Sequence, residues 1–215
     1  MSKKPSQEQD STAENHNLTK DTPDTKDDAN DGDDADSGDS QDAFSYELKI
    51  PEERIAVLIG TEGKVKKEIE EQTKCKLDIS KEGDVTITGE DGLILFITKE
   101  IVRAVGRGFN PKIAIQLLKT DYALEIIDLR DYAGKNKNTL ERLKARVIGT
   151  AGKARAEFER LTATSISIYG KTIGIIGSTE QVAYARQALE MLLEGAMHKT
   201  AYYFLERKRR EMRFG

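Results

Sequence analysis

Two stretches decide the fold: IGTEGK at residues 59–64 and IGTAGK at residues 148–153. In both, two glycines with two residues between them follow an aliphatic run and precede a lysine. The second pair, Gly149 and Gly152, lies 89 residues after the first pair, Gly60 and Gly63. The same shift aligns further residues: Lys64 with Lys153, Glu70 with Glu159, and Thr73 with Thr162. Agreement across a loop and the segment after it indicates an internal duplication.

Each copy predicts the same order of elements: strand, helix, GxxG loop, helix, strand, strand, helix. Alternating apolar residues predict the strands, and apolar residues three or four apart predict the helices. In the first copy we expect strands at 44–50, 75–80 and 84–89, with helices from Pro51, from Lys64 and over 93–105. In the second copy we expect strands at 123–129, 165–170 and 172–177, with helices before Gly149, after Gly152 and from 179 to Ala196.

Helix starts and apolar stripes add detail to this order. Asn138 with Glu141, and Ser178 with Gln181, form expected N-cap pairs. Asn110 followed by Pro111 predicts the start of a helix that connects the copies. The residues expected in the core are Ile55, Leu58, Ile59, Val65, Ile69, Ala114, Leu117, Leu118, Leu140, Leu143, Val147, Ala154, Phe158, Leu161, Val182, Ala185, Leu189, Leu192 and Ala196.

The glycine pair does not fit a nucleotide-hydrolysing enzyme. A P-loop needs G-x-x-x-x-G-K-[ST], which surrounds a phosphate and places a hydroxyl after the lysine. Here the glycines are closer together, and Val65 and Ala154 follow the lysines. A loop between two helices also differs from the strand-to-helix turn of a dinucleotide fold. No paired carboxylates and no nucleophile with a base stand out, so we expect no catalytic residue.

A GxxG loop between two helices suits a nucleic-acid strand. Glycines let the backbone approach closely, and the next helix presents unpaired N–H groups and the positive end of its dipole to a phosphate. The KH domain has this arrangement, and its loop clamps about four nucleotides of a single strand. The sequence therefore predicts an α+β fold of two tandem type I KH domains, one at 44–120 with the connecting helix and one at 121–215 with a basic C-terminal helix.

The two loops differ in charge. Glu62, between the first two glycines, would repel phosphates, whereas Thr150 and Ala151 in the second loop carry no charge. Basic residues flank the second loop: Arg142, Lys144, Arg146, Lys153, Arg155 and Lys171. We therefore expect the second copy to bind RNA and the first mainly to support it or to dock a protein. For any one cation, the alternative is that it only solvates a helix face.

Two sets of site residues follow from this difference between the loops. The expected RNA-binding residues are Arg146, Ile148, Gly149, Thr150, Ala151, Gly152, Lys153, Arg155 and Lys171. The expected secondary or degenerate loop consists of Gly60, Thr61, Glu62, Gly63 and Lys64.

Charge divides the chain into an acidic start and a basic remainder. Residues 1–43 carry thirteen Asp or Glu against four Lys or Arg, and the rest carries 25 acidic against 30 basic residues. These first residues have almost no apolar side chain to bury, so we expect a disordered acidic tail. Two roles stay open for this tail: a solvating segment, or a nucleic-acid mimic that covers the basic body until RNA displaces it.

The cysteine and histidine counts and the hydropathy argue against disulfides, zinc sites and membrane segments. Cys75 is the sole cysteine, so no intrachain disulfide forms. Because only His16 and His198 accompany it, we expect no zinc site of nitrogen and sulfur ligands, and no cofactor. No run approaches the roughly 18 to 20 apolar residues of a membrane helix, and the N-terminus lacks the apolar core of a signal peptide. We expect a cytoplasmic, monomeric protein without membrane contact.

The chain resembles the tandem-KH rRNA-processing factors of archaea, the Dim-two family, which is related to the eukaryotic partner-of-Nob-one proteins. The resemblance covers about residues 46–213. It rests on RIAVLIGTEGKVKKEIE at 54–70, VGRGFNP at 105–111, LERLKARVIGTAGKAR at 140–155, YGKTIGIIG at 169–177 and YYFLERKRREMR at 202–213. A general KH protein does not need the second of these stretches between its two copies.

The resemblance implies a non-enzymatic factor that binds the single-stranded 3′ end of the small-subunit rRNA or its precursor. Such a factor helps to position the end-processing endonuclease during ribosome assembly. The positions that match the family's RNA contacts are Gly149, Thr150, Ala151, Gly152, Lys153 and Arg155, with Arg146 nearby. This chain lacks the basic residue that KH loops commonly carry between their glycines, and its acidic extension is not part of the family pattern.

Two further features each have two interpretations. The basic segment ERKRREMR at 206–213 is expected to be an exposed helix end that contacts rRNA or the second copy; the alternative is a nuclear localisation signal. Arg107, between Gly106 and Gly108, either caps the preceding helix or contacts RNA or a partner.

Three functions compete at this point. The first is an RNA-binding assembly factor, and the second is a KH-fold scaffold that docks proteins without gripping RNA. Glu62 and the absence of loop cations favour the scaffold. A nucleotide-hydrolysing enzyme is the third, although no residue constellation supports it.

Overall fold

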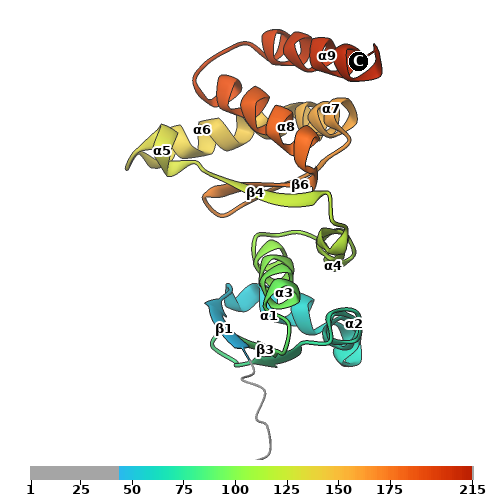
Figure 1. Cartoon of the computed structure of the whole chain (residues 1–215). Coiled ribbons are helices and arrows are strands. Elements are labelled where there is room, and N and C mark those ends of the chain that lie inside the picture. Colours follow the sequence, from blue (N-terminus) through green and yellow to red (C-terminus); the bar gives the residue numbers. More distant parts are fainter. Residues whose placement is uncertain (1–43, 215) are drawn as a thin grey trace, which may run out of the picture. The chain divides into compact units, whose positions relative to one another are not determined.

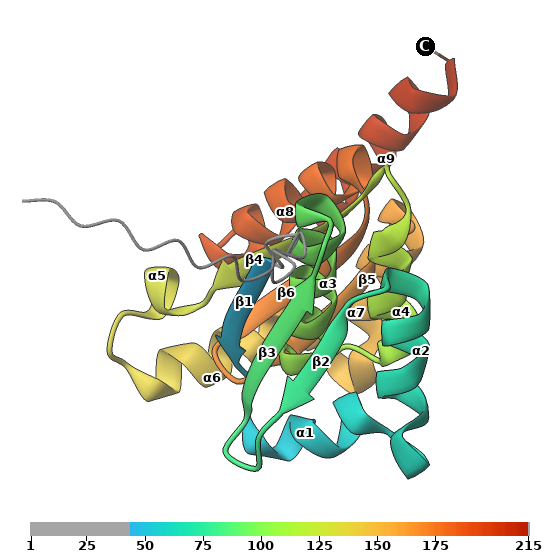
Figure 2. The same cartoon turned by 60° about the horizontal axis from the view of Figure 1, so that its bottom comes forward.

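The computed structural model describes residues 44–214 (Figures 1 and 2). The predicted acidic tail at 1–43 lies outside the described residues, and both roles weighed for it stay open. No helix in 44–214 is long and apolar enough to cross a membrane. Within the same range, no group of three or more His, Cys, Asp or Glu side chains could hold a metal ion.

The first copy forms a three-stranded antiparallel sheet with helices. Its elements are β1 Phe44–Lys49, α1 Glu52–Ile59, the 3-10 turn η1 Thr61–Gly63, α2 Lys64–Thr73, β2 Lys76–Ile79, β3 Asp84–Gly89 and α3 Gly92–Gly106. β3 is the central strand and pairs antiparallel with β1 and with β2. Figure 2 shows the three strands side by side in this order.

The second copy repeats the arrangement. Its elements are β4 Tyr122–Asp128, α5 Arg130–Ala133, α6 Lys137–Ile148, the 3-10 turn η3 Thr150–Gly152, α7 Lys153–Thr162, β5 Ser165–Tyr169, β6 Thr172–Ser178 and α8 Thr179–Leu193. β6 is the central strand, between β4 and β5. The final helix, α9 His198–Phe214, follows α8 (Figure 1). The predicted order of strand, helix, helix, strand, strand, helix is confirmed in both copies, with α5 as an unpredicted single turn.

Each copy buries its own apolar core between its sheet and its helices. Leu58, Ile69 and Ile87 are fully buried in the first core, and Phe158 and Ile175 are fully buried in the second. Most predicted core residues are buried. Ile55, Ile59, Val65, Leu118 and Ala196 are only half-buried, and the first, third and fourth of these pack against the first core.

Three details of helix ends differ from the sequence-based expectations. The N-cap of α6 is Asn136, whose side-chain oxygen accepts hydrogen bonds from the backbone N–H groups of Asn138 and Thr139; the prediction of Asn138 as the cap was wrong. Ser178 is the N-cap residue of α8, but its side chain makes no capping bond. α8 ends at Leu193, so the prediction that it continues to Ala196 was wrong.

The connecting segment forms a short α-helix followed by a 3-10 helix, and not one regular α-helix. The side chain of Asn110 accepts from the N–H of Lys112 and caps α4, Pro111–Ala114, which continues as the 3-10 helix η2, Ile115–Leu118. The predicted helix start is therefore confirmed, but the helix has a single α-helical turn before it tightens.

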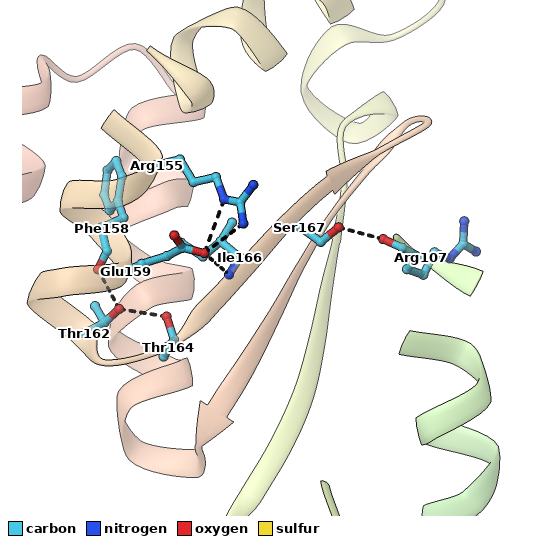
Figure 3. A network of polar contacts seen from close by, with 8 residues as sticks. All are labelled: Arg107, Arg155, Phe158, Glu159, Thr162, Thr164, Ile166 and Ser167. Atoms are coloured by element: carbon cyan, nitrogen blue, oxygen red, sulfur yellow. Dashed lines mark hydrogen bonds and ion pairs between the residues drawn. The ribbon is translucent and has the colours of Figure 1, made fainter. Parts of the chain in front are cut away.

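The VGRGFNP stretch packs against the sheet of the second copy. The hydroxyl of Ser167 on β5 donates to the carbonyl of Arg107 at 2.9 Å (Figure 3). A Cβ at Gly108 would lie 2.7 Å from that same hydroxyl oxygen, and a Cβ at Gly174 on β6 would lie 2.5 Å from the ring of Phe109. Only glycine fits at either position, so glycine at 108 in the connecting stretch and at 174 on β6 lets the two segments pack closely.

Candidate nucleic-acid interface

The second GxxG loop reverses the chain with three residues at positive φ. α6 ends at Ile148, and Gly149 follows at φ 72° and ψ 178°. Ala151 at φ 51° and Gly152 at φ 75° complete the reversal before α7 begins at Lys153. The backbone of a residue with a side chain rarely adopts such angles, so the two glycines permit this turn.

The two glycines have different surroundings. A Cβ at Gly149 would lie 2.5 Å from the Cβ of Ala154 and 2.8 Å from its backbone nitrogen. Around Gly152, no atom lies within 4 Å of the position that a Cβ would occupy. Gly149 is therefore required by the packing of the loop on α7, whereas Gly152 leaves open space above the backbone.

The start of α7 can accept a negatively charged group. Gly152 holds the N-cap position, and no side chain makes a capping hydrogen bond there. The first N–H groups of a helix carry the positive end of the helix dipole, and in α7 the N–H of Lys153 already bonds to the carbonyl of Thr150. A phosphate in the open space above Gly152 would face these groups without steric hindrance.

The predicted basic residues around this loop differ in whether they already form an ion pair with a carboxylate. Lys153 and Lys171 are exposed, and no carboxylate of the described residues lies within 4.0 Å of either ammonium group. Arg155 pairs with Glu159 at 3.1 Å, and Lys144 pairs with Glu141 at 2.9 Å. Lys171 lies in the two-residue turn between β5 and β6, and Arg142 is exposed on α6. Lys153, Lys171 and Arg142 are therefore exposed cations outside the ion pairs, whereas Arg155 and Lys144 are paired within their own helices.

Arg146 makes contacts that the sequence did not indicate. One guanidinium nitrogen donates to the carbonyl of Gly195 at 3.2 Å and to that of Ala196 at 2.5 Å. The Nε2 of His198 lies 2.9 Å from the carbonyl of Arg146; because a carbonyl oxygen only accepts, Nε2 carries the proton. These bonds tie the end of α6 to the start of α9. The role of Arg146 in RNA contact stays a prediction.

Two residues that align between the copies make equivalent structural bonds. A carboxylate oxygen of Glu159 accepts the backbone N–H of Ile166 at 2.8 Å (Figure 3), and Glu70 accepts that of Leu77 at the same distance. Each bond holds the helix after the loop against the next strand. The aligned threonines, Thr73 and Thr162, each donate to a carbonyl one helical turn earlier. These aligned residues therefore maintain the module, and they do not by themselves form a binding site.

The first loop has the same backbone but a different charge. Gly60, Glu62 and Gly63 have φ values of 72°, 57° and 74°, close to those of the second loop. Lys64 pairs with Glu62 at 3.2 Å, and both side chains are about three-quarters exposed. Because Glu62 neutralises the lysine that follows the loop, the first loop offers a backbone clamp without net positive charge.

Arg107 fits the capping interpretation. Its backbone N–H bonds to the carbonyls of Arg103 and Ala104, so it ends α3 at the C-cap position. Its carbonyl accepts the Ser167 hydroxyl, and its side chain is exposed. The backbone of Arg107 is thus structural, and a contact of its side chain with RNA or a partner stays a prediction.

Comparisons with known proteins agree with this geometry. The family described as the eukaryotic type KH domain, KH-domain type I, matches residues 123–210, and the KH domain family matches residues 45–96. KH domain-containing protein MJ0443 of Methanocaldococcus jannaschii is 48% identical over 177 residues, which are 80% of this chain and 78% of that protein. The two family matches confirm the predicted pair of tandem KH domains.

Two further relatives have names that describe their role. The pre-rRNA-processing protein PNO1 of Chaetomium thermophilum is 31% identical over 107 residues, which are 48% of this chain and 40% of that protein. A chain in the crystal structure of the a/eIF2alpha–aDim2p–rRNA complex from Pyrococcus horikoshii OT3 is 41% identical, with a TM-score of 0.75. That match covers 82% of this chain and 99% of the other.

Proposed function

We propose a function from one premise: the chain belongs to the Dim2/PNO1 family of tandem KH-domain rRNA-processing proteins. It is an RNA-binding factor for rRNA processing. The finer proposal is that its second KH domain binds single-stranded RNA near the 3′ end of the small-subunit rRNA and aids the processing of that end in the cytoplasm. The resemblance described above and the rRNA complex of the Pyrococcus relative support this choice of RNA.

The open backbone at Gly152 carries the proposal. A bound strand needs space for its phosphates and donors aimed at them, and the loop offers both, because no atom occupies the space above Gly152 and the start of α7 is uncapped. Lys153 and Lys171 add positive charge without a described carboxylate partner. In the proposed complex, the N–H groups at the start of α7 bind the phosphates, while Gly149, Thr150 and Ala151 bring the backbone close to the strand.

The charge difference between the loops assigns their roles. We place the main RNA contact in the second KH domain, because Glu62 and Lys64 neutralise each other in the first. The first domain then supports the second or docks an assembly protein, such as the endonuclease that acts at the 3′ end. The protein works as a monomer without catalytic residues of its own.

A salt titration tests this function. Purified protein should bind a single-stranded RNA with the 3′-terminal sequence of the small-subunit rRNA in preference to duplex DNA of the same length. With about three or four phosphate contacts, the logarithm of the binding constant should fall against the logarithm of salt concentration with a slope of about −2 to −3. A slope near zero, or equal affinity for duplex DNA, would contradict the proposed clamp.

A protein-docking scaffold is the second candidate, because the first loop pairs its own charges. Crosslinking in cells followed by sequencing of the attached RNA separates the two candidates. An RNA-binding factor should give rRNA adducts at residues 148–155, whereas a scaffold should give none there.

A further inference from the structure

The last helix is an addition to the KH element order. α9 follows the six-element string of the second copy, and within the described residues the first copy has no counterpart to it. Ala201 and Leu205 of α9 are buried in the second core, and the ring of Tyr202 packs edge-on against Phe158 of α7 at 5.2 Å. α9 is therefore a fixed part of the domain, and its packing creates a seam with α7.

We propose that the seam between α7 and α9 is a second RNA site, which takes the phosphodiester chain where it leaves the GxxG loop. The proposal rests on the function proposed above and extends it to a surface outside the KH loop. Its ligand is the flanking part of the same single strand. Two clefts lie along the seam, one at each end of α7.

The first cleft adjoins the loop itself. It has a volume of about 440 Å³ and is lined by Thr150, Lys153, Ala154, Glu157, His198 and Tyr202. Thr150 and Lys153 belong to the proposed RNA-binding residues, so a strand on the loop is already at the mouth of this cleft. The rings of His198 and Tyr202 have centroids 6.0 Å apart. Aromatic rings next to a phosphate clamp suit a base or ribose, because stacking on a ring tolerates any base.

The bonds of Arg146 and His198 hold the first cleft in position. His198 is the first residue of α9. Its ring contacts the carbonyl of Arg146, which lies two residues before the end of α6. The Arg146 guanidinium in turn holds the carbonyls that precede α9. The start of α9 is thus fixed relative to the loop before any ligand binds, which lowers the ordering cost of binding.

The second cleft is lined by arginine side chains, which suit phosphate groups. It has a volume of about 460 Å³ and is lined by Arg160, Leu161, Glu206, Arg209 and Arg210. Arg160 pairs with Glu157 at 2.6 Å, and this bond lowers the pKa of the Glu157 carboxyl, which stays ionised. No described carboxylate lies within 4.0 Å of the Arg209 or Arg210 guanidinium. The Nε of Arg210 donates to the carbonyl of Glu206 at 3.4 Å, which leaves its terminal nitrogens and the whole Arg209 guanidinium for phosphates at the far end of the seam.

The seam and the contact with β5 lie on different faces of α7. Glu159 faces β5 through its bond to Ile166, whereas Glu157 and Arg160 line the two clefts. α7 has ten residues, so the clefts are separated by no more than about 15 Å along the helix. A strand that leaves the loop can reach the arginines within a few nucleotides.

The test varies two things: the length of the RNA and the position on α9 from which positive charge is removed. One RNA of about five nucleotides covers the loop alone. Two RNAs of about twelve nucleotides extend it on the 5′ or the 3′ side. The test variant is Arg209→Gln with Arg210→Gln. The matched control is Arg207→Gln with Lys208→Gln, which removes the same charge from α9 at residues that pair with Glu211 and do not line the second cleft.

The proposal predicts that the test variant loses affinity for only one of the three RNAs. For the extension that enters the seam, the test variant should lose about tenfold in affinity, and its salt slope should fall by about 1.4 because two phosphate contacts are lost. The five-nucleotide RNA should bind the test variant as it binds the wild type, and the control variant should change affinity less than about twofold. Thermal unfolding of both variants checks that α9 stays packed.

Each contrary outcome has a separate meaning. Equal losses in the test and control variants, or an equal loss on the short RNA, overturn the seam and leave the proposed function intact. Equal binding of the long and short RNAs by the wild type does the same. If the wild type binds none of the three RNAs, the proposed function itself is overturned, and the seam with it.

Discussion

The change Gly152→Asp is expected to abolish RNA binding by the second KH domain while the domain stays folded. A Cβ at this position meets open space, and Asp tolerates positive φ better than most residues, so the fold survives. The carboxylate would occupy the space proposed for a phosphate, beside the uncapped start of α7. Like charges brought together in this way cost several kcal/mol, which predicts a loss of about a hundredfold or more.

Fluorescence anisotropy with the rRNA 3′-end oligonucleotide measures this loss, and thermal unfolding verifies the fold. Gly152→Asn has nearly the same shape without the charge, so it separates repulsion from bulk and should lose far less affinity. Gly63→Asp makes the matched change in the first loop, where a Cβ also meets open space, and should have the smaller effect of the two loops. A folded Gly152→Asp variant that binds RNA like the wild type removes this loop from the RNA interface.

Much of the fold could be predicted from the sequence because its signals are local. Alternation in DVTITG and the spacing of Leu140, Leu143 and Val147 depend only on the period of one element. Side chains of Leu140, Leu143 and Val147 are buried as predicted. The GxxG loop could also be predicted, because glycine best tolerates the positive φ at its first and last positions, although Glu62 and Ala151 adopt positive φ as well.

Contacts between distant segments could not be predicted in this way. Arg146 looks like one more cation beside the loop, yet its guanidinium binds carbonyls some fifty residues away. The choice between Asn136 and Asn138 as a cap depends on where the chain turns at Gly134, because either asparagine suits the role locally. The position of α9 against α7 likewise has no periodic signal, although the basic helix itself was expected.

Gly149→Ala is expected to destabilise the second domain strongly, in contrast to Gly152→Ala. At φ 72° and ψ 178° the backbone of Gly149 lies in a region that is essentially restricted to glycine, which costs another residue about 1–3 kcal/mol. The new Cβ would also lie 2.5 Å from that of Ala154, and overpacking of this kind costs about 1–3 kcal/mol more. The expected loss is therefore about 2–6 kcal/mol.

Gly152→Ala isolates the backbone contribution, because its Cβ meets no atom and only the left-handed conformation is penalised, by about 1–2 kcal/mol. Chemical denaturation, followed by a signal from the second domain, measures both variants against the wild type. Equal losses would contradict the assignment of different roles to the two glycines. Below its unfolding transition, Gly149→Ala should lose much less RNA affinity than Gly152→Asp, because the added methyl group carries no charge and the open surface at Gly152 is unchanged. Stability would then depend mainly on the first glycine of the loop and RNA binding mainly on the second, which accounts for both residues of the motif.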